Sequence, residues 1–170
     1  MIIFETDRLR VRQLQRADRS FYLQLFGDSD VVRFIRPPQT EETIDGFLSD
    51  HLSKNLELFP GGRFIVEELH SGIGIGSFVV IPIEAQPDFQ IGYAFLKEYW
   101  GRGLATELIQ AGIAYSFEVC ELTQLFALIE VHNLASQKVV EKAGFHFFEI
   151  REENGVYLKC FRLLKSKTTP

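Results

Sequence analysis

The stretch Gln90–Thr106, QIGYAFLKEYWGRGLAT, decides the fold, because an apolar strand-like run ends within it and a helix begins at once. Gly101 and Gly103 flank Arg102 at that junction, and glycines let a backbone turn tightly and approach a ligand closely. A helix starting at Leu104 presents unpaired amides and the positive end of its macrodipole, and Arg102 adds a full charge beside them. The junction therefore predicts an anion site, with a phosphate or pyrophosphate as the natural guest.

Two familiar anion-binding schemes do not fit this junction. The nucleotide P-loop needs a lysine and then Ser or Thr after its last glycine, whereas Leu104 and Ala105 follow Gly103. The dinucleotide fingerprint needs a third glycine where this chain has Thr106. The remaining pattern, WGRGLA from Trp100, resembles the pyrophosphate loop of the GNAT superfamily of acyl-CoA-dependent N-acetyltransferases, although Trp100 replaces the usual Gln or Arg.

Further segments, in the right order, extend this resemblance over about residues 3 to 164. They are similar to segments of the ribosomal-protein (serine/alanine) N-terminal acetyltransferases and amine acetyltransferases, a branch that often carries aromatic-Trp-Gly-basic-Gly in its loop. The segments are Thr6–Arg12, Asp28–Phe34, Asn133–Ser136 and Glu141–Phe145. Each is weak alone, and together they are specific.

Strand-like and helix-like runs alternate along the chain. Strands are expected near residues 8–14, 63–69, 74–83, 89–96, 125–131, 145–150 and 156–164, and helices near 17–26, from a Thr40 cap to about 56, over 104–119 and over 134–143. The glycines at 72, 74 and 76 indicate close strand contact or a bulge. The resemblance implies an α/β (α+β) fold with a mixed, mostly antiparallel seven-stranded sheet and about four helices. In it, the strand before the loop and the strand before Asn133 run parallel and splay apart.

The resemblance also implies acetyl-CoA as cosubstrate and no metal. The splay would expose backbone groups near Phe95 and Leu96 to the pantetheine arm. The cofactor-binding residues that it implies are Phe95, Leu96, Trp100, Gly101, Arg102, Gly103, Leu104, Ala105, Thr106, Asn133 and Ser136.

Acetyl transfer from a thioester needs a neutral amine and a proton for the departing thiolate. Ser136 resembles a serine near the CoA sulfur in some relatives, and its alternative is an exposed residue of a first helical turn. Asn133 resembles an asparagine that bonds the pantetheine region, and its alternative is a helix N-cap; both roles are compatible.

The sequence does not identify the residue that acts as general base. Relatives often have Glu where this chain has Gln90, which cannot take a proton and is assigned to orienting water or acceptor. Deprotonation then falls to Glu84, Asp88 or Glu130, or to water. Glu130 is the better candidate because it lies in an apolar strand directly before the Asn motif, and an edge-exposed or salt-bridged carboxylate is its alternative.

The expected acceptor is an amine, either a protein N-terminus or a small amine. The net charge of −5 argues against a nucleic-acid surface and suits a cationic acceptor. Asp28 and Asp30 are candidate acceptor contacts. Because Gln90 replaces a base, a CoA-binding regulatory or interaction module without turnover remains the alternative function.

Composition predicts a single domain over residues 1–170, with 165–170 as a loose tail. No apolar run is long enough to span a bilayer or form a signal-peptide core, so a cytoplasmic monomer or homodimer is expected. Cys120 and Cys160 make no disulfide framework or metal spacing and are expected to be buried fillers.

Overall fold

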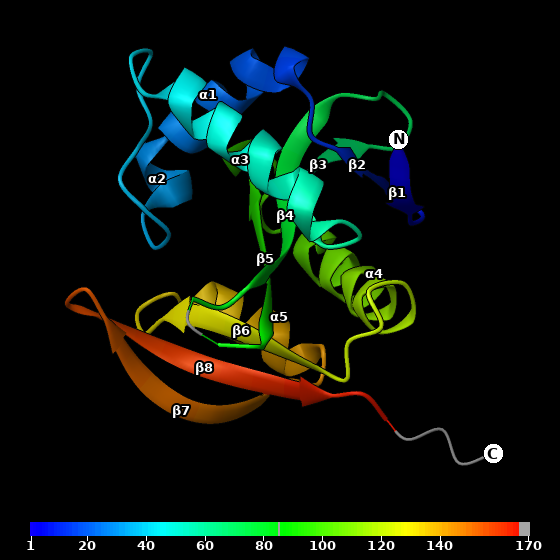
Figure 1. The fold of residues 1–170 in the computed structure, drawn as a ribbon, viewed down its shortest axis with the longest axis vertical. Helices are drawn as coiled ribbons and strands as arrows, with labels where there is room; N and C mark the ends of the chain where they lie inside the picture. The colour runs from blue at the N-terminus through cyan, green and yellow to red at the C-terminus, as the bar shows by residue number, and fades with distance from the viewer. Residues whose placement is uncertain (85, 167–170) are drawn as a thin grey trace.

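The computed structural model describes residues 1–84 and 86–166 (Figure 1). Its strands are β1 (Ile2–Glu5), β2 (Leu9–Gln13), β3 (Gly62–Glu68), β4 (Gly74–Pro82), β5 (Phe89–Phe95), β6 (Gln124–Glu130), β7 (His146–Glu153) and β8 (Val156–Leu164). Its α-helices are α1 (Arg19–Gly27), α2 (Ser29–Val32), α3 (Ile44–Leu58), α4 (Leu104–Glu118) and α5 (Leu134–Lys142). Short 3-10 turns η1 (Arg16–Asp18) and η2 (Lys97–Tyr99) precede α1 and follow β5.

One sheet holds all eight strands in the order β1-β2-β3-β4-β5-β6-β8-β7. Every neighbouring pair is antiparallel except β5 and β6, which are parallel. These two strands pair only at Gln90 and Phe126 and separate beyond that point. The predicted splayed parallel pair is therefore confirmed, and Figure 1 shows β5 running between an N-terminal half (β1–β4 with α1–α3) and a C-terminal half (β6–β8 with α5).

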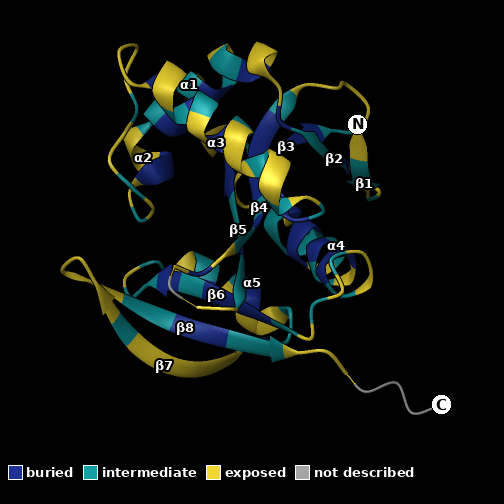
Figure 2. Ribbon diagram, in the orientation of Figure 1, coloured by how far each residue is buried: buried dark blue, intermediate teal, exposed yellow. Residues whose placement is uncertain are grey.

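Alternation along β3 sends neighbouring side chains to opposite faces of the sheet. Phe64 and Val66 pack in a core that includes Leu108 of α4, whereas Ile65 packs in a second core with residues of α1–α3. Helices α1 and α3 therefore cover one side of the sheet. Figure 2 shows this two-sided burial in the central strands, while the edge strand β7 is largely exposed.

Several boundaries differ from the expectations. Over residues 1–84 and 86–166 the sheet has eight strands, not seven, because Ile2–Glu5 pairs with β2; four residues with mixed exposure give too short a pattern to read. The same ranges hold five α-helices, since α2 forms a single turn after Asp28. Thr40 does not cap α3: Thr43 precedes Ile44, and the Thr40 hydroxyl instead bonds Glu42.

The structure shows how the glycines near residue 76, the turn between β7 and β8 and the end of the chain are arranged. A Cβ on Gly76 would lie 2.4 Å from the Ala94 carbonyl oxygen, and β3 and β4 shift register beside it, so the close-contact interpretation is confirmed. Asn154 and Gly155 both have left-handed backbones, with φ of 51° and 80°, in the β7–β8 turn. Lys165, the first residue of the expected tail, donates to the carbonyls of Thr123 and Phe117, and residues 167–170 lie outside the described range.

Candidate functional site

Two cavities meet where β5 and β6 separate. The first, of about 440 Å³, lies against the segment 99–106 and is here called the loop cavity. The second, of about 320 Å³, lies between the two halves of the sheet and is called the sheet cavity. Both are lined by Phe34, Ile35, Tyr93, Ala94, Asn133 and Ser136. The two cavities are therefore neighbours at this junction, separated by no more than these shared lining residues.

The loop has the conformation that its glycines predict. Gly101 and Gly103 have φ of 72° and 77°, the left-handed region that side chains disfavour, and Gly103 is the N-cap residue of α4. The free amides at the start of this 15-residue helix lie beside the loop cavity, and Gly101 to Thr106 all line it. The arrangement fits an anion at the helix N-terminus.

Arg8 holds the loop from outside, a contact that the sequence did not reveal. Its Nη1 donates to the carbonyl oxygen of Arg102 at 2.9 Å, and its Nε donates to Glu107 of α4 at 2.6 Å. The Arg102 carbonyl and the Gly103 N–H belong to one trans peptide and point in opposite directions. Arg8 therefore turns the Gly103 N–H away from itself, and the segment Thr6–Arg12 that resembled an opening strand also fixes the loop.

Trp100 lines the loop cavity, and its indole N–H donates to the Phe95 carbonyl at 2.7 Å. Phe95 lines the cavity as well, together with Ala94. Leu96 does not: its N–H donates to Ile75 and its carbonyl accepts from Tyr99, because the chain folds back into η2. At the end of β5, Ala94 and Phe95 thus line the cavity in which a cofactor arm is expected, whereas Leu96 does not.

At the junction, the Ser136 hydroxyl lies 3.2 Å from the Tyr93 hydroxyl. Burial raises the pKa of Tyr93, while the Ser136 hydrogen bond acts in the opposite direction, so both groups carry protons at neutral pH. Asn133 Oδ1 accepts from the Ser136 N–H at 3.2 Å, so Asn133 is a helix N-cap and also lines both cavities. The sequence analysis did not name Tyr93 as a site residue. Its place between the small residues Gly92 and Ala94 in a strand could have drawn attention to it.

The candidates for the base are separated in space. Glu130 lines the sheet cavity with a side chain 13% exposed, and His132 Nε2 lies 3.9 Å from its carboxylate. Gln90 lines the same cavity. Asp88 accepts from Gln124 at 2.6 Å, and Glu84 is exposed; neither lines a cavity.

The acidic candidates before the sheet are paired. Lys97 Nζ lies 2.8 Å from Asp30 and 3.5 Å from Asp28. Asp28 also caps α2 by accepting from the Asp30 N–H. Asp30 lines the loop cavity, so the structure places it beside the expected cofactor position, while Asp28 lines neither cavity.

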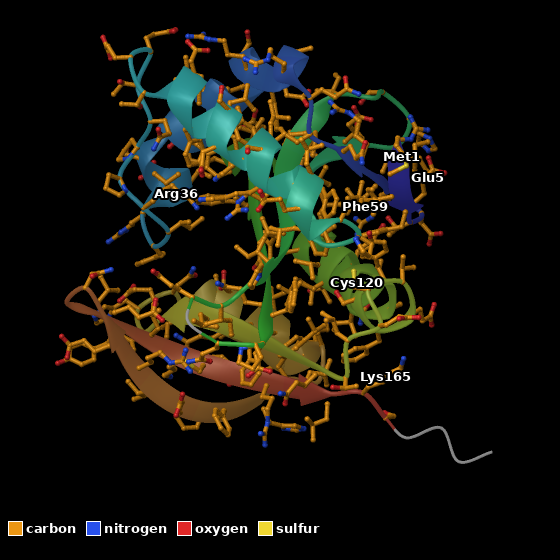
Figure 3. The ribbon with its side chains drawn as sticks, viewed as in Figure 1. Met1, Glu5, Arg36, Phe59, Cys120 and Lys165 are labelled. Atoms are coloured by element: carbon orange, nitrogen blue, oxygen red, sulfur yellow. The ribbon has the colours of Figure 1, made fainter. Side chains whose placement is uncertain are left out.

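Two arginines line the sheet cavity and were not among the expected site residues. Arg36 follows α2, and Arg63 is the second residue of β3. Figure 3 labels Arg36 beside α2, in the N-terminal half of the molecule. No pattern near them in the sequence marks a site, because they come from separate elements.

Within residues 1–84 and 86–166, no group of three or more His, Cys, Asp or Glu side chains is arranged to hold a metal. No helix in these ranges has the length and hydropathy needed to cross a membrane. Cys160 is buried, as expected, but Cys120 is only partly buried.

Comparison with known proteins assigns the architecture. Residues 8–146 match the family model described as an acetyltransferase (GNAT) domain. The Bacillus subtilis protein YkkB is 31% identical over 149 residues, covering 84% of each chain, and the Vibrio cholerae spermidine N(1)-acetyltransferase is 28% identical over 170 residues, covering 94% of this chain and 95% of the relative. RimL, a ribosomal α-N-protein acetyltransferase solved with coenzyme A, superposes with a TM-score of 0.82 at 15% identity, covering 96% of this chain and 98% of RimL. The loop, the parallel splay and these matches together show that the chain belongs to the GNAT acetyltransferase family.

Proposed function

We propose that this chain transfers the acetyl group of acetyl-CoA to a primary amine by direct attack while both substrates are bound. The observation that carries the proposal is the meeting of the loop cavity and the sheet cavity at Tyr93, Asn133 and Ser136. A ternary complex needs two sites whose reacting ends touch, and these two cavities share one wall. Relatives solved with coenzyme A, such as RimL, support the choice of cosubstrate.

The loop cavity fits the cosubstrate. The left-handed turns at Gly101 and Gly103 leave the loop amides uncovered by side chains, and Arg102 and the α4 macrodipole supply positive potential for a pyrophosphate. Ala94, Phe95 and Trp100 would line the path of the pantetheine arm toward the junction. Acetyl-CoA, when bound there, supplies an acetyl group already activated as a thioester.

The residues at the junction can move both protons of the reaction. A primary amine attacks only when neutral, and Glu130 is a carboxylate within the sheet cavity that can take the ammonium proton. As the new C–N bond forms and the C–S bond breaks, the thiolate needs a proton. The paired hydroxyls of Ser136 and Tyr93 lie at the junction and can donate it, and they regain a proton from the attacking nitrogen as that nitrogen becomes an amide. Gln90 would orient the acceptor, since its amide cannot act as a base.

The acceptor class is a primary amine, either a protein N-terminus or a small amine. Relatives support both: the Vibrio cholerae relative is named a spermidine acetyltransferase, and RimL is named an α-N-protein acetyltransferase. The test is calorimetric titration with CoA, followed by free-thiol release from acetyl-CoA across amines and peptides. We expect binding and acceptor-dependent thiol release. Binding without release across a broad panel would instead favour a CoA-binding regulatory module.

A further inference from the structure

One wall of the sheet cavity carries two cationic side chains that lack an acidic partner. Arg36 Nε and Arg63 Nη1 are buried, and neither has a hydrogen-bond partner in the part of the chain that the structure describes. Neither arginine takes part in an ion pair with any carboxylate in that same part. Buried polar groups are ordinarily hydrogen-bonded, and buried charges are ordinarily paired. Both arginines line the sheet cavity, so a ligand there meets two guanidinium groups that no carboxylate of the described fold pairs with.

Both arginines are held in place by contacts that leave those donors free. The Arg36 guanidinium lies over the rings of Phe47 and Phe26, with its carbon 4.8 Å and 5.6 Å from their centroids. Ring contacts engage a guanidinium face, whereas its N–H groups point outward in the plane. The backbone of Arg63 is fixed by Asn55, which accepts from its N–H and donates to its carbonyl.

Asp50 is the acidic group that acts on Arg63 through space, but it pairs with Lys54 at 2.8 Å, and the other titratable groups on this wall are uncharged. His51 Nδ1 lies 3.1 Å from the Tyr22 hydroxyl. Burial, followed by the charges of Arg63 and Arg36, lowers the pKa of His51 to about 3, so it is neutral at pH 7. Burial raises the pKa of Tyr22, which stays protonated.

The charged side chains on the opposite side of the cavity are negative. Glu130 of β6 and Glu153 at the end of β7 line it. The sheet cavity is therefore polarised, with cations on the α2–β3 side and carboxylates on the β6–β7 side. A ligand with one positive and one negative end matches this arrangement.

We propose that the acceptor is a small amine that carries an anionic group, a carboxylate or a phosphate, and that Arg36 and Arg63 bind this group. The inference rests on the proposed acetyl transfer and narrows its acceptor. Planar guanidinium groups recognise carboxylate and phosphate oxygens through paired N–H donors. A polyamine would instead place an ammonium beside two guanidiniums. The cavity of about 320 Å³ suits a small molecule. The net charge of −5 for the whole chain favoured a cationic acceptor, but the cavity wall formed by Arg36 and Arg63 is positively charged.

The activity test uses matched acceptors. Aminocarboxylates of two to six carbons are compared with their amides and with diamines of equal length, and phosphoethanolamine is compared with ethanolamine. We expect kcat/KM at least 10-fold higher for the anionic members. Arg63→Met and Arg36→Met should each raise KM for an anionic acceptor roughly 10- to 100-fold without changing KM for acetyl-CoA. Arg33→Met is the control, because Arg33 is exposed, packs over Phe34 and lines neither cavity. Diamines or neutral amides used as well as the anionic members would overturn the proposal.

A binding test separates this inference from turnover. Thermal denaturation is measured with succinate and glutarate, and with succinamide as the neutral match, all at saturating CoA so that the anion site of the loop cavity is already occupied. The anions should raise Tm of the wild-type protein and of Arg33→Met, but not of Arg63→Met or Arg36→Met. No shift with any anion, or an equal shift in the arginine variants, overturns the anion site. Anion binding without thiol release from any acceptor would reject the proposed transfer and leave the anion site standing.

Discussion

Replacing Gly103 with valine should remove most of the CoA affinity while leaving the fold in place. At φ 77° a β-branched residue is strained by about 1–2 kcal/mol, whereas a Cβ there meets only Arg8 Nη2 at 3.7 Å, an ordinary contact. The fold can absorb that strain. In the loop, however, the side chain would stand between amide and phosphate. Losing one or two charge-assisted hydrogen bonds at ~1.5 to 3 kcal/mol each weakens binding at least tenfold.

A second glycine provides the matched control for that substitution. Gly155 has nearly the same backbone, φ 80°, and open space around its Cβ, but it lies in the β7–β8 turn. Gly155→Val should therefore share the loss of stability and keep normal CoA affinity. Calorimetric titration and urea unfolding of both variants measure the two effects. If Gly103→Val bound CoA as tightly as Gly155→Val, the assignment of the loop as the pyrophosphate site would be refuted.

Three further predictions follow from contacts in and around the site. Arg8→Met should raise the Kd for CoA about tenfold, because one charge-assisted bond no longer orients the Gly103 peptide; calorimetry with an unchanged Kd would contradict this. Ser136→Ala should lower kcat roughly 10- to 100-fold, with acetyl-CoA affinity unchanged. Adding Tyr93→Phe should lower kcat little further, because the two hydroxyls act as one donor pair. If steady-state rates showed that the two substitutions lower kcat by the product of their separate effects, the hydroxyls would not act as a pair. His51 has a folded pKa of about 3 against 6.5 unfolded, so its contribution to stability is present above pH 6.5 and is lost as pH falls toward 3. In urea unfolding across that window, wild-type stability should fall more steeply than that of His51→Gln, by up to about 1.4 kcal/mol per pH unit, and parallel curves would show that the unfolded state gains no extra proton there.

Local features of the fold were readable from the chain. The strand ending near Phe95, the glycine turn and the helix from Leu104 depend on residues close in sequence, and all three formed as expected. The Asn154-Gly155 turn is equally local. Two predictions also failed for local reasons. Strand β1 is too short to show a period, and the hydroxyl of Thr40, the expected helix cap, donates to the Glu42 carboxylate instead.

What the sequence by itself determined is therefore the glycine loop and the order of strands and helices around it, because backbone conformation at Gly101 and Gly103 and the start of α4 are set within a few residues. What only the tertiary structure decided is the set of charges that line the sheet cavity. Arg36, Arg63 and Glu130 come from three separate elements and share a cavity only after β5 and β6 part. Which charges stay unpaired there depends on long-range packing, since Lys97 pairs with Asp28 and Asp30 while no carboxylate in the described chain forms an ion pair with the two arginines. Composition sums charge over the whole surface, whereas a binding site responds to the few charges that folding brings together and removes from water.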